Sequence, residues 1–213
     1  MPTILFDIDG TLLDTAPGVM EAARFAIGEM GFAALPDEVL RRFVGPPPVE
    51  SYQKFCGATE EQAHRAAALH RQYGREKGLY ASRPYPGMAR LLEELEKSGA
   101  RLGVATLKAQ DVAESILEYH GFKARFGAIV GVDATETRTK RRTIELALEQ
   151  LGSRASEAVL IGDSEYDREG ASRAGVAFLG VDWGYGFAPH APGTVSTVAE
   201  LSAALTKWME ELR

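Results

Sequence analysis

The chain has 213 residues, and 24 Lys and Arg against 30 Asp and Glu give it a formal net charge of −6 at pH 7. This acidic balance excludes a general nucleic-acid binder, which needs a basic face to displace counterions from phosphate. With 45% hydrophobic and 25% charged residues the chain is typical of a globular protein, and it has no apolar run long enough to span a bilayer.

The first residues lack the features of a secretory signal, and the sole cysteine is Cys56. One cysteine cannot form an internal disulfide, which fits a reducing compartment. We therefore expect a cytoplasmic protein with no membrane partner.

Five short apolar runs without alternation are typical of strands that are buried on both faces. They lie at Thr3–Phe6, Leu102–Ala105, Ala128–Val130, Ala158–Ile161 and Val176–Val181. Helical spacing of apolar residues follows at 88–95 and 144–151, and residues 198–212 predict a final amphipathic helix. Strands that alternate with helices predict an α/β fold, a Rossmann-like parallel sheet flanked by helices.

Residues 16–83 interrupt this alternation with helical patterns alone. Turn residues at Gly31, Pro36, 45–48 and Gly57 divide the segment into about four helices, and Thr59 to Gln62 form a capping-box signature. The sequence therefore predicts an all-helical cap at 16–83, inserted after the first strand of a core made of residues 1–15 and 84–213. Open α/β sheets bind ligands beyond the carboxyl ends of their strands, where this insertion begins.

Two carboxylates follow the first predicted strand in Asp7-Ile8-Asp9-Gly10-Thr11. Because side chains alternate along a strand, residues two apart point the same way, and two close carboxylates need a cation or a shared proton. Oxygen ligands suit Mg²⁺, Gly10 permits a sharp turn, and Thr11 offers an anion a hydroxyl and a backbone N–H. Solvated acids at the end of a strand are the alternative interpretation of this segment alone.

Polar residues also follow or precede the other predicted elements. Thr106 follows the second strand, Lys140 precedes the helix at 143–151, and Asp163 and Asp167 follow the fourth strand. Each alone has an ordinary explanation, such as a solvated basic segment for 138–142. Their order along the chain is the stronger observation.

An acid pair, a Thr, a Lys and a second acid pair after successive strands resemble the motifs of the haloacid dehalogenase superfamily. The resemblance extends from Ile4 to the C-terminal helix and is greatest to the phosphatase branch, with its cap between the first two motifs. Four further segments resemble phosphoglycolate-phosphatase-like proteins, namely 43–47 (FVGPP), 77–80 (KGLY), 85–87 (YPG) and 184–186 (GYG).

The resemblance implies a Mg²⁺-dependent phosphatase for a small-molecule phosphate monoester. Asp7 would be the nucleophile that forms an aspartyl phosphate, and Asp9 the general acid and base. Backbone N–H groups near Asp9 and Gly10 would assist at the phosphoryl group. The implied metal residues are Asp7, Asp9 through its backbone carbonyl, Asp163 and Asp167, and the implied phosphate-binding residues are Gly10, Thr11, Thr106, Leu107 and Lys140.

Some positions depart from the family pattern. Leu107 stands where relatives commonly have Asn or Ser, and Ser164 and Glu165 replace residues that are often basic or polar. We expect the cap to determine specificity, with Arg42 and Lys77 as candidates. The four histidines, at 64, 70, 120 and 190, are expected to be surface or packing residues, and Trp183 and Tyr185 to shape or pack near the mouth of the pocket.

Several functions remain open from the sequence. Within the same fold, a 5'-nucleotidase that acts on nucleoside monophosphates and a sugar phosphomutase are alternatives to a phosphoglycolate-like phosphatase. A phosphorylated receiver domain is a non-enzymatic alternative, although such domains lack a cap, and an inactive cap-gated binding module is another. The sequence is compatible with a monomer or a homodimer.

Overall fold

The computed structural model describes residues 1–133 and 138–212. Its central feature is a six-stranded, wholly parallel sheet in the order β5-β4-β1-β6-β7-β8. The strands are β1 (Thr3–Phe6), β4 (Arg101–Ala109), β5 (Ala128–Val132), β6 (Ala158–Gly162), β7 (Ala177–Val181) and β8 (Thr194–Val195). The predicted α/β class and its five strands are confirmed, whereas the two-residue β8 was not predicted.

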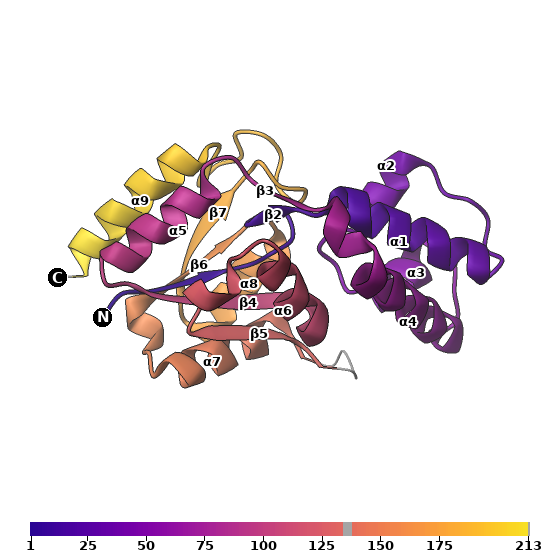
Figure 1. Ribbon diagram of the computed structural model, residues 1–213, viewed down its shortest axis with the longest axis horizontal. Helices are drawn as coiled ribbons and strands as arrows, with labels where there is room; N and C mark the ends of the chain where they lie inside the picture. Colours follow the sequence, from indigo (N-terminus) through magenta and orange to yellow (C-terminus); the bar gives the residue numbers. More distant parts are fainter. Residues whose placement is uncertain (134–137, 213) are drawn as a thin grey trace.

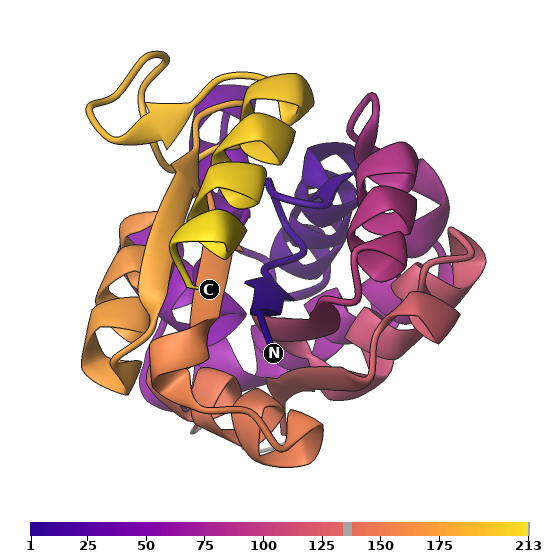
Figure 2. The same cartoon turned by 90° about the vertical axis from the view of Figure 1, so that its left-hand side faces the viewer.

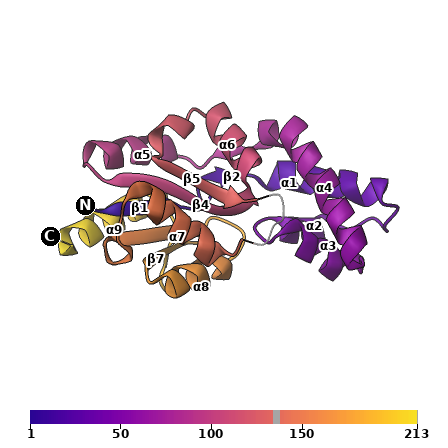
Figure 3. The ribbon, with the colours of Figure 1, turned by 90° about the horizontal axis from the view of Figure 1, so that it is seen from below.

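Helices cover both faces of this sheet, as Figure 3 shows from below. On one face lie α5 (Met88–Lys97), α6 (Gln110–Tyr119) and α9 (Val198–Glu211), which pack on Ile4 and Phe6 of β1. On the other lie α7 (Lys140–Leu151) and α8 (Glu165–Ala174), which pack on Leu5. The alternation of β1 side chains therefore divides the core into two apolar layers. Single 3₁₀ turns, η3 (Lys123–Arg125) and η4 (Ala155–Glu157), precede β5 and β6.

The segment after β1 forms the helical cap, which lies apart from the sheet in Figure 1. It contains α1 (Ala16–Glu29), α2 (Asp37–Leu40), α3 (Pro48–Cys56) and α4 (Glu60–Glu76), with 3₁₀ turns η1 (Arg41–Phe43) and η2 (Gly78–Ala81). Thr59 and Gln62 form the predicted capping box at the start of α4. Small and aromatic side chains of α1, α3 and α4 make a separate apolar cluster, so the cap has its own core.

Two short strands connect the cap to the core. β2 (Leu13–Asp14) leads into the cap and pairs antiparallel with β3 (Arg83–Pro84), which leads out of it. The predicted limits of the cap, at 15/16 and 83/84, fall beside or within this pair. We refer to β2 and β3 as the hinge strands.

The topology places the cap over the carboxyl ends of the central strands. β1 lies between β4 and β6, so the chain extends outward from β1 on one side and then returns to β6 on the other. Ligands bind at such a switch point in open α/β sheets. Both termini lie on the opposite end of the core, which faces the viewer in Figure 2.

Candidate active site

Three buried carboxylates meet beyond the carboxyl ends of β1 and β6. Asp7, Asp163 and Asp167 each place an oxygen within 4.8 Å of the other two. Asp7 directly follows β1, Asp163 directly follows β6, and Asp167 lies in the first turn of α8. The structure thus brings together three of the four residues predicted to form the metal site.

Lys140 provides the positive charge within this cluster. It is the first residue of α7, only 5% exposed, and its Nζ lies 2.7 Å from Asp7 Oδ1 and 2.5 Å from Asp167 Oδ1. Its basic neighbours are engaged elsewhere, since Arg141 and Arg142 pair with Glu145. Of the basic residues at 138–142, Lys140 is therefore the one that contacts the carboxylates.

The remaining oxygens show which carboxylates suit a metal ion. Asp167 Oδ2 accepts hydrogen bonds from the backbone and hydroxyl of Ser164, and Oδ1 contacts Lys140, so both of its oxygens are engaged. Asp7 contacts Lys140 through Oδ1, and Asp163 accepts the hydrogen bonds of Tyr185 and Gly186 through Oδ2. Two convergent carboxylate oxygens fit Mg²⁺, which commonly takes one or two carboxylates and several waters.

Burial and mutual repulsion raise the pKa values of the two carboxyls that are left for the metal. Burial, followed by the charge of Asp167, raises the pKa of Asp163 to about 8. For Asp7, burial outweighs the opposing charge of Lys140 and raises the pKa to about 6. Burial opposes the charge on Lys140, but its two carboxylate partners raise its pKa to about 12. The cluster therefore favours a bound cation over two unpaired negative charges.

Glycines allow the backbone to approach Asp163 closely. The backbone N–H groups of Tyr185 and Gly186 donate to Asp163 Oδ2 over 2.6 and 3.2 Å. A Cβ at Gly184 would lie 2.2 Å from this oxygen, and a Cβ at Gly10 would lie 2.3 Å from it. Gly10 also has a φ of +75°, which favours glycine. Both glycines are needed because the carboxylate occupies the space that a side chain would fill.

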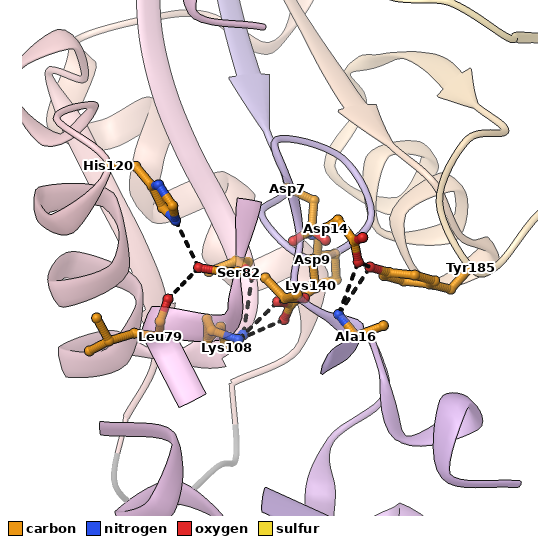
Figure 4. Close-up of polar contacts among 12 residues, drawn as sticks. Asp7, Asp9, Asp14, Ala16, Leu79, Ser82, Lys108, His120, Lys140 and Tyr185 are labelled. Atoms are coloured by element: carbon orange, nitrogen blue, oxygen red, sulfur yellow. Dashed lines mark hydrogen bonds and ion pairs between the residues drawn. The ribbon is translucent and has the colours of Figure 1, made fainter. Parts of the chain in front are cut away.

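The Asp9 carboxylate lies outside the cluster of three and faces the cap. Thr15, the residue before α1, donates to Asp9 Oδ1 over 2.6 Å, and Lys108 Nζ lies 2.8 and 3.1 Å from its two oxygens (Figure 4). The predicted contribution of Asp9 to the metal site is its backbone carbonyl, which stays a prediction. Lys108 was not singled out from the sequence, although its position two residues after Thr106 places it at this site.

The sequence predicts that backbone N–H groups of the turn after Asp9 face an anion, but two of them form hydrogen bonds within the turn. The N–H of Gly10 donates to Leu13 O over 3.0 Å, and the N–H of Thr11 donates to Ile8 O over 3.2 Å. Closing the tight turn therefore engages these two N–H groups, and the assignment of Gly10, Thr11 and nearby N–H groups to anion binding stays a prediction. The Thr11 hydroxyl is buried and has no hydrogen-bond partner among the described residues.

Strand β4 is longer than predicted and includes residues that were expected to follow it. It ends at Ala109 rather than Ala105, so Thr106 and Leu107 lie within the strand. Thr106 is buried, and its hydroxyl accepts a hydrogen bond from the backbone N–H of Lys108. Its predicted role as a phosphate ligand stays a prediction, whereas Leu107 lines the cavity described next.

A cavity of about 70 Å³, measured for water-sized spheres, separates the cap from the core beside Asp9. Apolar side chains form most of its wall. Its charged or polar lining includes Lys108 from the core and His70 and Arg71 from α4. The cap candidates Arg42 and Lys77 are absent from this lining, because they lie over the rings of Phe55 and Tyr73.

Tyr185 joins the core to the hinge. Its hydroxyl donates to Asp14 of β2 and accepts from the backbone N–H of Ala16, at the start of α1 (Figure 4). Its own backbone N–H binds Asp163, so one residue contacts both the carboxylate cluster and the base of the cap. Trp183 donates to the carbonyl oxygen of Thr11, and its ring centroid lies 5.9 Å from that of Tyr85 at an interplanar angle of 53°.

Among the described residues, no helix combines the length and the apolar character that a membrane span requires. The fold and site together define a phosphohydrolase of the α/β class with an inserted helical cap. Residues 4–181 match the family of haloacid dehalogenase-like hydrolases, and the chain belongs to this family. It is a phosphoric monoester hydrolase, related to phosphatases of the same fold.

Similar proteins are named for several different activities. The chain is 38% identical to a 5'-nucleotidase of Pseudomonas aeruginosa over 87% of its length and 84% of that protein. It is 31% identical to the tyrosine-protein kinase PtkA of Mycobacterium tuberculosis, over 98% of this chain and 72% of that protein. It is 32% identical to a phosphoglycolate phosphatase of Caulobacter vibrioides, over 86% of this chain and 80% of that protein.

A solved structure agrees over almost the whole chain. The crystal structure described as a predicted phosphatase from Clostridium acetobutylicum has a TM-score of 0.91, with 32% identity. The similarity covers 97% of this chain and 98% of the other. The arrangement of core and cap therefore recurs in a second member of the family.

Proposed function

We propose that this chain is a Mg²⁺-dependent phosphatase that hydrolyses small phosphate monoesters through an aspartyl phosphate on Asp7. One observation carries the proposal: Asp7, Asp163 and Lys140 meet in a buried cluster, while Asp9 faces the neighbouring cavity from the same turn. A nucleophile and a proton donor are thereby held on adjacent sides of one small space.

The two aspartates divide the chemistry between them. An oxygen of Asp7 attacks phosphorus while the ester bond breaks, and Asp9 gives its proton to the departing alkoxide. Asp9 then takes a proton from a water that attacks phosphorus, which releases phosphate and regenerates Asp7. Such a covalent route divides one difficult displacement into two easier ones.

The surrounding charges stabilise the transferring group. Lys140 holds Asp7 in place and, with the hydroxyl of Thr106, opposes negative charge on the phosphoryl oxygens. Bound Mg²⁺, held by Asp7 and Asp163, would supply further positive charge there. Asp167 positions Lys140, because both of its oxygens are already occupied.

Phosphate release from a panel of esters, with Mg²⁺ and with EDTA, tests the proposal. We expect turnover with Mg²⁺, its loss with EDTA, and its recovery when Mg²⁺ is restored. Trapping of a phosphorylated protein whose modified peptide contains Asp7 would identify the nucleophile. A folded protein that releases no phosphate from any ester would overturn the proposal.

Phosphoglycolate and nucleoside monophosphates are the two substrate candidates to compare. A relative named phosphoglycolate phosphatase supports the first, and the 38% identity to a protein named 5'-nucleotidase supports the second. The ratio of kcat/KM for the two substrates decides between them. Return of the phosphoryl group to a sugar phosphate would instead indicate a mutase.

A further inference from the structure

His70 is a buried histidine that lines the cavity without belonging to the carboxylate cluster. It is 7% exposed, lies in α4, and lines the cavity together with Asp9 and Lys108. Its Nδ1 lies 3.0 Å from the hydroxyl of Tyr52, which is fully buried in α3. The sequence indicated only a surface or packing role for it.

The contact with Tyr52 determines the tautomer of His70. Among the described residues, His70 Nδ1 is the hydrogen-bond partner found for the Tyr52 hydroxyl. A buried hydroxyl that does not donate leaves its proton unsatisfied, so we assign Tyr52 as the donor and Nδ1 as the acceptor. In a neutral ring, the proton then resides on Nε2.

The surroundings keep both groups neutral. Burial, aided by the charges of Lys108 and Arg71, lowers the pKa of His70 to about 3. Burial also raises the pKa of Tyr52 far above its ordinary value. The pair therefore presents a neutral N–H donor at neutral pH.

The rest of the cavity defines what this donor would meet. Among the described residues that line it, Arg71 and Lys108 are cationic and Asp9 is anionic, and the others are mainly apolar or glycine. One water requires about 10–15 Å³ on this measure, so a volume of about 70 Å³ holds roughly five to seven such groups. The space suits a short alcohol with an anionic oxygen.

We propose that His70 is a specificity-determining residue that donates from Nε2 to a carboxylate on the leaving alcohol, so that the cavity selects short phosphate monoesters whose alcohol carries a carboxylate. This inference rests on the proposed function, because it assigns the cavity to the leaving group. Tyr52 acts as a positioning residue, since it contacts the imidazole and fixes its tautomer.

Binding to an Asp7→Asn background tests the inference without turnover. The variants are His70→Leu, which removes the donor, His70→Gln, which retains one near Nε2, and Tyr52→Phe, which removes the tautomer constraint. His64→Leu is the matched control, because His64 is exposed on the same helix. Calorimetry with Mg²⁺ present compares 2-phosphoglycolate, glycerol 3-phosphate, a nucleoside monophosphate, phenyl phosphate and inorganic phosphate.

We expect His70→Leu to weaken the binding of 2-phosphoglycolate about tenfold or more, since a hydrogen bond to a charged group is lost. The affinity for glycerol 3-phosphate should fall less, because its hydroxyls are uncharged. The affinities for phenyl phosphate and inorganic phosphate should be unchanged. His70→Gln should restore most of the affinity, Tyr52→Phe should have an intermediate effect, and His64→Leu none.

Unchanged binding of 2-phosphoglycolate in His70→Leu would overturn the inference. Equal weakening of inorganic phosphate binding would do so too, because it would show a general structural defect. Tighter binding of nucleoside monophosphates than of 2-phosphoglycolate would also overturn it. Failure of the unmodified chain to release phosphate from an ester that it binds would instead count against the proposed function alone.

Discussion

The core and the cap contribute to the same cavity in contrasting ways. On the core side, the reactive side chains are each held by defined partners, as Lys140 is by two carboxylates and Asp163 by two backbone N–H groups. On the cap side, the wall is mainly apolar, and His70 is held by the hydroxyl of Tyr52. This contrast supports the proposal that the core performs the chemistry and the cap recognises the leaving group.

The largest effect should follow from Asp7→Asn, which removes the proposed nucleophile from the core side. We expect turnover to fall by about 10⁴-fold or more, because loss of a covalent nucleophile removes the route itself. Phosphate release and thermal unfolding should be measured together, with the exposed cap variant Asp37→Asn as control. Substantial activity in Asp7→Asn would place the nucleophile elsewhere.

Lys140→Met should have the next largest effect. It leaves Asp7 and Asp167 buried without their cation, so we expect a loss of about 3–5 kcal/mol in the unfolding free energy of the metal-free protein. Turnover should fall by about 10²–10³-fold, as when one group that stabilises the transition state is removed. Arg141→Met, next to it but exposed, should change neither denaturant unfolding nor turnover, and similar losses in both variants would contradict the assignment.

Gly184→Ala tests the close packing that holds Asp163. The new Cβ would lie 2.2 Å from Asp163 Oδ2 and would displace the carboxylate. We expect Mg²⁺ affinity to fall about tenfold, as it does when groups that orient a ligand are lost. Gly28→Ala is the control, because nothing lies within 4 Å of that position in α1. It should leave Mg²⁺ binding unchanged and raise stability by about 0.5–1 kcal/mol, and equal Mg²⁺ affinities in both variants would exclude the packing role.

The smallest expected effect is the pH dependence of the thermal stability of the metal-free protein. Folding raises the pKa of Asp163 from 3.8 to about 8, so the folded state binds more protons than the unfolded state between these values. The stabilising contribution of the protonated carboxyl is complete below the lower value and is lost as the pH rises through the higher one. We expect the Tm without metal to fall over this range and Mg²⁺ to raise the Tm most at its alkaline end, where it competes with fewer protons. A Tm that rises with pH without metal would contradict the buried cluster.

The sequence predicted the core side far better than the cap side, for a physical reason. Asp7, Lys140 and Asp163 each adjoin a strand or begin a helix with clear apolar periodicity, so local pattern and the rules of parallel sheets place them together. His70 and Lys108 line the same cavity only because α4 packs against α3 and the cap rests on the core. No local spacing encodes that packing.

The two-residue strands were not predicted from the sequence for a related reason. β2, β3 and β8 have two residues each, too few for an alternation to be recognised, and their pairing depends on distant parts of the chain. The extension of β4 to Ala109 was likewise hidden, because Thr106 and Lys108 are polar residues in a strand whose first half is apolar. Polar strand ends are expected at a site, where function competes with propensity.

The pairing of the hinge strands also has a consequence for how such proteins diversify. Because Asp14 lies opposite Arg83, the chain leaves the core and rejoins it at neighbouring points. For the sheet, the whole cap is equivalent to the loop of a β-hairpin, and insertions are tolerated best where chain ends lie close together. A different cap could therefore be grafted between these two residues without changing the register of the sheet, and substrate range could evolve by exchange of this module while the catalytic aspartates stay in place.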